Sequence, residues 1–90
     1  MKRPIVVINP NSNQSVTDGL GECLARFNNN KSHPIECVTL KNGPFGIESQ
    51  LDADSVILPL ANFVKTRPDA GAFVIACYSD PGIDTCRSVT

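Results

Sequence analysis

Tryptophan is absent from this 90-residue chain, and histidine, tyrosine and methionine occur once each. Cysteine occurs four times, without any Cys-x-x-Cys pair, at Cys23, Cys37, Cys77 and Cys86. Structural zinc sites use closely spaced cysteine and histidine ligands, so this pattern predicts no metal site. The single histidine, His33, precedes a proline, which is typical of an extended loop residue. Disulfides are not expected either, because a cytoplasmic chain keeps its thiols reduced.

The chain also lacks an excess of either charge and any long hydrophobic run. Eight basic side chains against nine acidic ones give a net charge of −1, which argues against a nucleic-acid or anionic membrane partner. The apolar run at residues 5–8 is too short for a signal peptide or a membrane span. The glycine-rich motifs that bind dinucleotides or nucleoside triphosphates are missing. We therefore expect a cytoplasmic protein that needs no cofactor and binds a small molecule.

What the chain does contain is an alternation of strand-like and helix-like segments. Its length allows one small domain. Short apolar runs that suit buried strands lie at residues 5–8, 35–40 and 72–77. With helices between them, the predicted fold is α/β, a doubly wound three-layer unit on a parallel sheet. Right-handed crossovers favour the strand order 2-1-3, which places Asn9 and Cys77 at adjacent carboxyl ends.

The helices follow from apolar spacing and capping signals. One face of the first helix is predicted to carry a buried stripe, formed by Val16, Leu20, Cys23, Leu24 and Phe27. A polar loop over residues 28–32 follows it. The second helical region begins at Ser49, with Asp52 completing a capping box, and Pro59 should kink or divide it. The last helix is expected to start with Asp80 as N-cap and Pro81 at its first position.

Cys77 is the main candidate for chemistry. It closes an apolar strand, at the edge of the sheet where α/β folds place reactive groups. A helix starting just after it would favour the thiolate, which could act as a base or a nucleophile. Cys23 and Cys37 are instead predicted to be small core residues. The amides of Asn9 and Asn11 could bind a ligand with carbonyl and N–H groups, or could cap the first helix, and the two roles can coexist.

Three segments of the chain together resemble a known family. They are Ile8-Asn9-Pro10-Asn11-Ser12, Gly43-Pro44-Phe45-Gly46-Ile47-Glu48-Ser49 with Asp52, and Ala76-Cys77-Tyr78-Ser79-Asp80-Pro81-Gly82-Ile83-Asp84. In this order and spacing they are similar to the N-terminal half of hydantoin racemases, in the Asp/Glu/hydantoin racemase superfamily. The Asp-Pro-Gly after the cysteine resembles the hydantoin or allantoin branch. Residues 1–90 would then be the N-terminal part of a domain whose second lobe is absent.

The resemblance implies a cofactor-independent racemase of 5-substituted hydantoins or allantoin. In that family two lobes each supply one cysteine, and the two thiols exchange a proton on opposite faces of the substrate carbon. Cys77 would be the first of the pair, Asn9 and Asn11 would lie against the substrate ring, and Ile47 would line its substituent pocket. Tyr78 and Ser79 would offer backbone N–H groups to an enolate oxygen.

The family's second cysteine, in a Gly-Cys-x-Gly context, has no counterpart in these residues. We therefore expect them to be the first part of a longer protein, inactive alone and a homo-oligomer when complete. Two alternatives stay open. One is a relative of arylmalonate decarboxylase or maleate isomerase, and the other is a non-catalytic α/β module that binds a small ligand.

Overall fold

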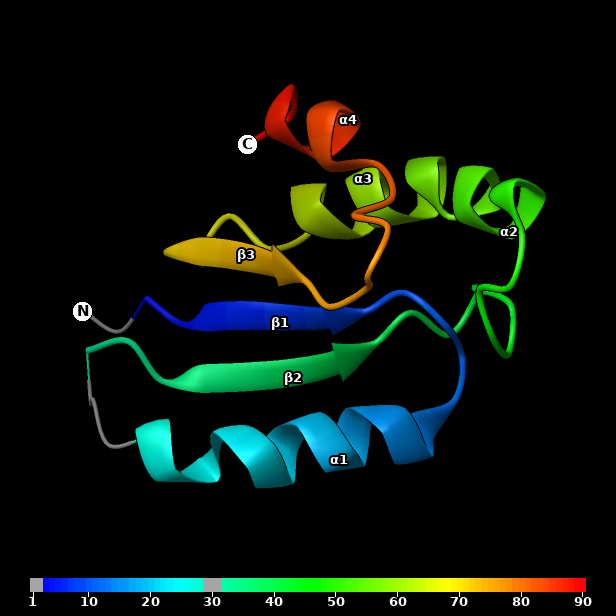
Figure 1. The fold of residues 1–90 in the computed structure, drawn as a ribbon. Helices are drawn as coiled ribbons and strands as arrows, with labels where there is room; N and C mark the ends of the chain where they lie inside the picture. Colours follow the sequence, from blue (N-terminus) through cyan, green and yellow to red (C-terminus); the bar gives the residue numbers. More distant parts are fainter. Residues whose placement is uncertain (1–2, 29–31) are drawn as a thin grey trace.

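The computed structural model describes residues 3–28 and 32–90 of the chain. Residues 29–31 of the predicted polar loop therefore lie outside the described residues. Figure 1 shows the elements in chain order, which are β1 (Ile5–Asn9), α1 (Gln14–Leu24), the 3-10 turn η1 (Ala25–Phe27), β2 (Ile35–Thr39), α2 (Gln50–Ser55), α3 (Ile57–Lys65), β3 (Ala72–Ile75) and α4 (Ile83–Arg87). None of the helices in the described part is long and apolar enough to cross a membrane.

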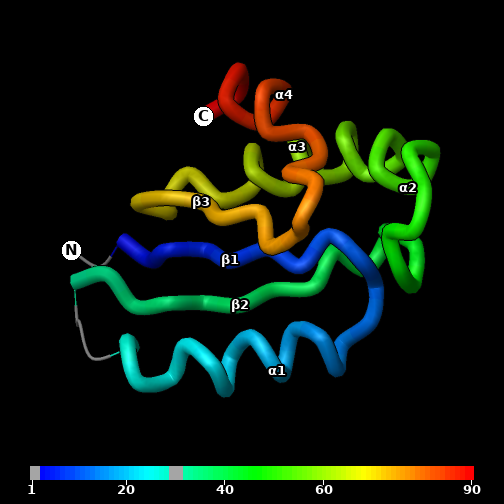
Figure 2. The backbone as a smooth tube through the Cα atoms, in the orientation of Figure 1, coloured from blue at the N-terminus to red at the C-terminus, as the bar shows by residue number. Residues whose placement is uncertain are grey.

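The strands form one parallel sheet in the order β2-β1-β3, which confirms the predicted architecture and strand order. In the register of the sheet, Asn9 lies opposite Thr39 and Ile8 lies opposite Ile75. α1 covers one face of the sheet, and α2, α3 and α4 lie on the other (Figures 1 and 2). The carboxyl ends of all three strands therefore meet at one edge.

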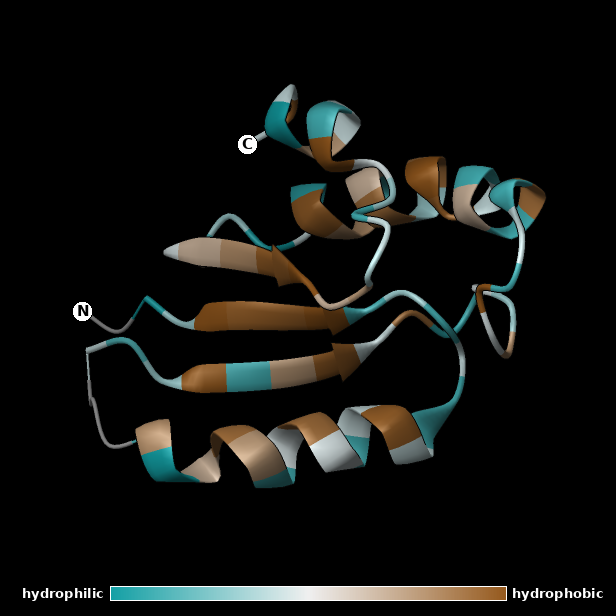
Figure 3. Ribbon diagram, viewed as in Figure 1, coloured by the Kyte–Doolittle hydropathy of each residue, from teal (hydrophilic) through white to brown (hydrophobic). Residues whose placement is uncertain are grey.

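The core lies between the sheet and α3. β1 is the central strand and is apolar along nearly its whole length (Figure 3), so side chains on both of its faces are buried. Alternation sends Val6 and Ile8 toward α3, where they pack against Leu60 and Val64. Their neighbour Asn9 points the other way, toward α1, since its side chain bonds to that helix. Side chains of β1 therefore contact the helices on both faces of the sheet.

The second helical region is divided, as Pro59 predicts. α2 ends at Ser55 and α3 begins at Ile57, with Val56 between them. Pro59 stands in the first turn of α3, where a missing backbone N–H breaks no helical hydrogen bond. Ser49 caps α2 by accepting from Asp52 N–H at 3.1 Å. The predicted N-cap is therefore confirmed. The return bond of a capping box is replaced, because the Asp52 carboxylate accepts from Glu48 N–H at 3.0 Å and not from Ser49 N–H.

The prediction for the apolar stripe of α1 is wrong in part, because Cys23 is exposed. The face of α1 that meets the sheet is centred on Thr17, whose hydroxyl bonds to Asn9 and Thr39. Two members of the predicted stripe are also exposed, Val16 in α1 at 39% and Phe27 in η1 at 58%. The spacing of apolar residues predicts an apolar stripe on α1, but it does not predict which side of the helix the sheet covers.

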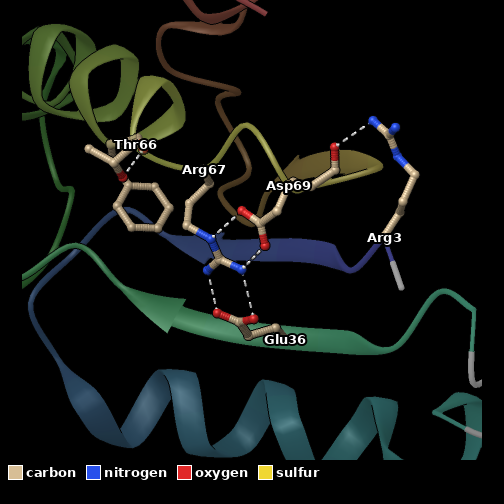
Figure 4. Close-up of polar contacts among 7 residues, drawn as sticks. Arg3, Glu36, Thr66, Arg67 and Asp69 are labelled. Atoms are coloured by element: carbon tan, nitrogen blue, oxygen red, sulfur yellow. Dashed lines mark hydrogen bonds and ion pairs between the residues drawn. The ribbon is translucent and has the colours of Figure 1, made fainter. Parts of the chain in front are cut away.

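An ion-pair network ties the segment before β3 to β2 (Figure 4). Arg67 Nη1 and Nη2 both donate to the carboxylate of Glu36, with Nη2 to Oε1 at 2.9 Å. Arg67 also donates to Asp69, from Nε at 3.0 Å and from Nη2 at 2.9 Å. These hydrogen bonds from Arg67 lower the pKa of the Glu36 carboxyl below its ordinary value of 4.5. The pKa of the Asp69 carboxyl is lowered for the same reason.

We expect the contribution of Glu36 to stability to be lost in acid. A carboxyl with a lowered pKa stabilises the fold above its unfolded-state pKa and loses that contribution as the pH falls through its folded-state pKa. Because Glu36 is partly exposed, the Glu36→Gln change should cost about 1 kcal/mol or less near neutral pH. Urea unfolding between about pH 6 and about pH 3 should show this cost shrinking toward zero, with Glu22→Gln on the exposed face of α1 as the control. A cost that stays constant with pH would contradict the assignment.

Candidate active site

The carboxyl edge of the sheet is built from the loops that follow each strand. Two hydrogen bonds continue the sheet past its strands, from Leu40 N–H to Asn9 O at 2.9 Å and from Ala76 N–H to Ile8 O at 2.8 Å. β3 itself ends at Ile75, two residues before the predicted end of the strand. Cys77 consequently stands just past the strand, in the loop that crosses to α4.

Cys77 occupies the first position of a tight turn. Its N–H donates to Ile75 O at 3.0 Å, and its carbonyl accepts from Asp80 N–H at 3.1 Å. The side chain is partly buried, and Sγ lies 3.7 Å from Ser79 Oγ. The turn therefore holds a partly accessible thiol beside a hydroxyl that can donate a hydrogen bond to it.

The central residues of this turn are Tyr78 and Ser79. Within the described part of the chain, no group accepts a hydrogen bond from either of their backbone N–H groups. The Tyr78 side chain is fully exposed. Tyr78 and Ser79 can therefore offer a ligand two successive backbone N–H donors next to the thiol. Such a pair of donors suits an anion.

The predicted helix start after Cys77 is wrong. Asp80 does not cap a helix and Pro81 is not in one, because α4 begins at Ile83 with Gly82 as its N-cap and has no side-chain cap. Asp80 and Gly82 both adopt positive φ, 47° and 73°. A Cβ on Gly82 would lie 3.2 Å from Ile57 Cα, so the chain passes close to α3 just before α4 begins, at a position that favours glycine. The helix start that was expected directly after Cys77 is therefore absent from this turn.

Asn9 and Asn11 form the core of the β1–α1 loop. Asn9 is 1% exposed, and its Nδ2 donates to Asn11 Oδ1 at 2.8 Å, Asn13 O at 3.1 Å and Thr17 Oγ1 at 3.1 Å. Its Oδ1 accepts from Asn11 N–H at 3.2 Å. The helix cap is neither of these residues but Asn13, which accepts from Ser15 N–H. The hydrogen bonds described for the Asn11 side chain use Oδ1 alone, which leaves Nδ2 to donate to a ligand.

A pair of threonines supports this loop and was not singled out from the sequence. Thr17 Oγ1 and Thr39 Oγ1 lie 2.6 Å apart, and Thr39 also donates to Gln14 Oε1 at 2.7 Å. They join α1 to the ends of β1 and β2. One feature of the sequence could have indicated them, because Thr39 lies at the end of the second strand, opposite Asn9 in the register of the sheet. We assign these threonines a positioning role.

The β2–α2 loop packs directly on the β1–α1 loop. Ser12 N–H donates to Pro44 O at 2.8 Å. At Gly43 the backbones approach so closely that a Cβ would lie 2.2 Å from Pro10 O. Ile47, farther along the loop, is partly buried and packs against the core cluster. The segments that carry Asn11 and Ile47 are thus held as one unit at the carboxyl edge.

The other thiols are separated from this edge or buried. Cys86, on α4, is buried in the core cluster, and burial raises the pKa of its thiol. Cys37 is partly buried in the middle of β2, and burial raises the pKa of its thiol too. Cys23 lies on α1, and His33 precedes β2 at the opposite edge of the sheet. Among the described residues no group of three or more His, Cys, Asp or Glu side chains could hold a metal ion.

Two cavities lie away from Cys77. One, of about 400 Å³, runs along β3 beneath α3 and α4 and has Arg3 and Arg87 on its rim. The other, of about 460 Å³, lies between Thr39 and the side of α3. Neither is bordered by Cys77. We locate the candidate site by its chemistry, at the open carboxyl edge, rather than by the size of a cavity.

Comparison with known proteins identifies the family of this chain. The family model of Asp/Glu/Hydantoin racemase matches residues 5–90. A hydantoin racemase from Pseudomonas sp. (strain NS671) is 39% identical, over 96% of this chain and 35% of that protein, and one from Paenarthrobacter aurescens is 31% identical, over 96% and 37%. The structure of an allantoin racemase from Klebsiella pneumoniae matches with a TM-score of 0.79 and 27% identity, over 96% of this chain and 36% of that one. The chain thus spans about a third of the length of these relatives, and it belongs to the Asp/Glu/hydantoin racemase family.

Proposed function

We propose that the complete protein, meaning a polypeptide of the length of these relatives that contains residues 1–90, is a cytoplasmic racemase of 5-substituted hydantoins or allantoin. The observation that carries the proposal is the position of Cys77. Of the four thiols, it is the one in the turn after β3, at the carboxyl edge of the sheet. The names of the relatives point to a five-membered cyclic ureide as the substrate.

The reaction needs a base and an acid on opposite faces of one carbon. The thiolate of Cys77 would remove the proton from the stereogenic carbon, and the electron pair of the broken C–H bond would move onto the adjacent carbonyl oxygen as an enolate. A second thiol, from outside residues 1–90, would then form a new C–H bond on the opposite face. One thiol ends protonated and the other ionised, so the next turnover runs in reverse. A thiol suits this exchange because its ordinary pKa of about 8.5 lies near neutrality.

The neighbouring groups have separate roles in this scheme. The N–H groups of Tyr78 and Ser79 would donate to the enolate oxygen, where they stabilise charge that develops during the reaction. Asn11 Nδ2 would contact a ring carbonyl. Asn9 would hold Asn11 against the ring, since its own amide is already fully used. Ile47 would line the pocket for the ring substituent. No cofactor or metal ion takes part.

Solvent exchange tests this scheme. One enantiomer of a 5-substituted hydantoin is incubated in deuterium oxide, and deuterium at the stereogenic carbon is followed by proton NMR. The complete protein should incorporate deuterium and invert the carbon. Residues 1–90 alone should do neither above the uncatalysed rate, because only one of the two thiols is present. Exchange by the 90-residue chain would overturn the requirement for two thiols, and a complete protein without activity on hydantoins or allantoin would overturn the substrate assignment.

A further inference from the structure

A chain of side-chain hydrogen bonds runs from the candidate site into the layer between α1 and the sheet. All of its members belong to β1, α1, β2 or the loop that joins β1 to α1. Each bond needs a donor and an acceptor, so the groups at the two ends decide the direction of the bonds between them. The side chains, in order from the site outward, are Asn11, Asn9, Thr17, Thr39, Gln14 and Asp18.

Asp18 fixes the direction of these bonds at the outer end. Gln14 Nε2 donates to Asp18 Oδ1 at 3.0 Å, because an ionised carboxylate only accepts. Gln14 Oε1 is therefore the acceptor for the Thr39 hydroxyl, at 2.7 Å. A hydroxyl has one hydrogen to donate, and that of Thr39 is used on Gln14. In the 2.6 Å contact between Thr17 Oγ1 and Thr39 Oγ1, the donor is consequently Thr17.

The Thr17 oxygen is left as an acceptor toward Asn9. The side-chain group of Asn9 that faces it is Nδ2, at a distance of 3.1 Å, and both residues are buried. If the Asn9 amide were reversed, two acceptor oxygens would face each other in a buried place, which costs free energy. The backbone N–H of Asn11 and the backbone carbonyl of Asn13 favour the same orientation of Asn9.

Asn9 in turn orients the amide of Asn11. Asn9 Nδ2 and the Asn13 N–H both donate to Asn11 Oδ1, at 2.8 Å and 2.9 Å. A reversed Asn11 amide would face these two donors with its own NH2 group. The group of Asn11 that remains for a ligand is therefore Nδ2, which can only donate.

We infer that Thr17 is a positioning residue: through Asn9 it fixes Asn11 as a hydrogen-bond donor, and so makes the site select its substrate by a carbonyl oxygen. This inference rests on the proposed function and adds to it a residue that does not touch the substrate. A site with a fixed donor discriminates against an analogue that lacks the acceptor, because the donor is then left unpaired. A ring with sulfur in place of the carbonyl oxygen is such an analogue, since sulfur accepts hydrogen bonds weakly.

Solvent exchange of side-chain amide hydrogens in the 90-residue chain, followed by NMR, tests the positioning without any activity. The Asn9 NH2 hydrogens should exchange slowly and those of Asn11 fast. Thr17→Val removes the hydroxyl and should accelerate exchange at Asn9 about fivefold, the effect of one hydrogen bond. Thr17→Ser keeps the hydroxyl and should preserve the slow exchange.

Thr39→Val provides a second variant in which Thr17 is unaltered. It removes the acceptor of the Thr17 hydrogen, which can then turn toward Asn9 Nδ2 and oppose it, so exchange at Asn9 should again accelerate. The matched control is Val16→Thr, the reverse exchange of side chains at an exposed neighbouring position of α1. It should leave exchange at Asn9 unchanged, and far-UV circular dichroism should show that every variant is folded.

In the complete protein, the selection is measured with a 5-substituted hydantoin and its 2-thio analogue. The ring carbonyl at position 2 is the one that does not become the enolate, so it is the one assigned to Asn11. Thr17→Val should lower the ratio of the two kcat/KM values about fivefold, mainly by raising KM for the hydantoin. Thr17→Ser should restore the ratio. Differences in intrinsic reactivity cancel, because the same two compounds are compared in each protein.

The two measurements separate this inference from the proposed function. Exchange at Asn9 that is unchanged in both Thr17→Val and Thr39→Val would overturn the positioning. An unchanged ratio of kcat/KM values in an active Thr17→Val protein would overturn the selection of a carbonyl oxygen. A complete protein that is inactive on hydantoins and allantoin would contradict the proposed function instead, and exchange at Asn9 would still decide whether Thr17 positions the amides.

Discussion

Replacing Cys77 with serine in the complete protein should lower the rate of racemisation by a factor of about 10³ or more. Serine keeps the size and the hydrogen-bonding capacity of the side chain. Its hydroxyl, however, is far too weak an acid to ionise near neutral pH, so one of the two proton transfers is lost. Because either direction of the reaction needs both groups, inversion of both enantiomers should slow together. Polarimetry of each pure enantiomer measures this loss.

The control for that variant is Cys23→Ser. Cys23 is the exposed thiol on α1, and it takes no part in the carboxyl edge. This change should leave racemisation within about twofold of the unaltered protein, as expected for a surface substitution away from the site. If Cys77→Ser retained most of the activity, or if Cys23→Ser removed it, the assignment of the catalytic thiol would be wrong.

Gly43→Ala should destabilise the fold by about 3 kcal/mol. The new methyl group would lie 2.2 Å from Pro10 O, which is backbone and cannot rotate away. To accept it, the β2–α2 loop must separate from the β1–α1 loop, at the expense of the hydrogen bond between Ser12 and Pro44. The measurement is the free energy of unfolding in urea.

Gly19→Ala is the matched control for Gly43→Ala. Gly19 lies within α1, and a Cβ there meets no atom within 4 Å. Alanine should therefore stabilise the chain by about 0.5 to 1 kcal/mol, since glycine costs conformational entropy in a helix. The two substitutions add the same methyl group and should change stability in opposite directions. A Gly43→Ala variant within about 0.5 kcal/mol of the unaltered chain would show that the two loops are not packed as described.

The sheet could be predicted from the sequence because each strand is specified by residues that are neighbours in the chain. The run at residues 5–8 is apolar on both faces, which is typical of a central strand in a parallel sheet covered on both sides. Once the helices between the strands were recognised, right-handed crossovers left the order β2-β1-β3 as the favoured one. Pro59 likewise predicts the division between α2 and α3, because its ring fixes φ and removes a backbone N–H donor.

The errors arose where contacts between distant segments override a local signal. Asp80-Pro81 has the sequence of a helix start, yet α4 begins only at Ile83, after Asp80 and Gly82 have adopted positive φ and Gly82 has passed close to Ile57. The orientation of α1 was mistaken for a similar reason. The side that meets the sheet carries Thr17, which accepts a hydrogen bond from Asn9 Nδ2 and shares one with Thr39 Oγ1, and no periodicity of apolar residues encodes these contacts.

The candidate site, too, could be predicted from the sequence only in part. Its position at the carboxyl edge follows from the fold class, and its thiol follows from the residue that comes just after β3. The separate functions of Asn9 and Asn11 do not. In sequence the two amides look equivalent, but Asn9 is fully hydrogen-bonded inside the loop, whereas Asn11 retains a free donor.

Deuterium incorporation from each separate enantiomer by the Cys77→Ser variant of the complete protein tests the central claim most directly. Without Cys77, the second thiol can still remove a proton from the face that it contacts and return deuterium to that same face. We expect exchange without inversion for one enantiomer and no exchange for the other. Equal exchange from both enantiomers, or continued racemisation, would contradict the role of Cys77 as one of two opposed thiols.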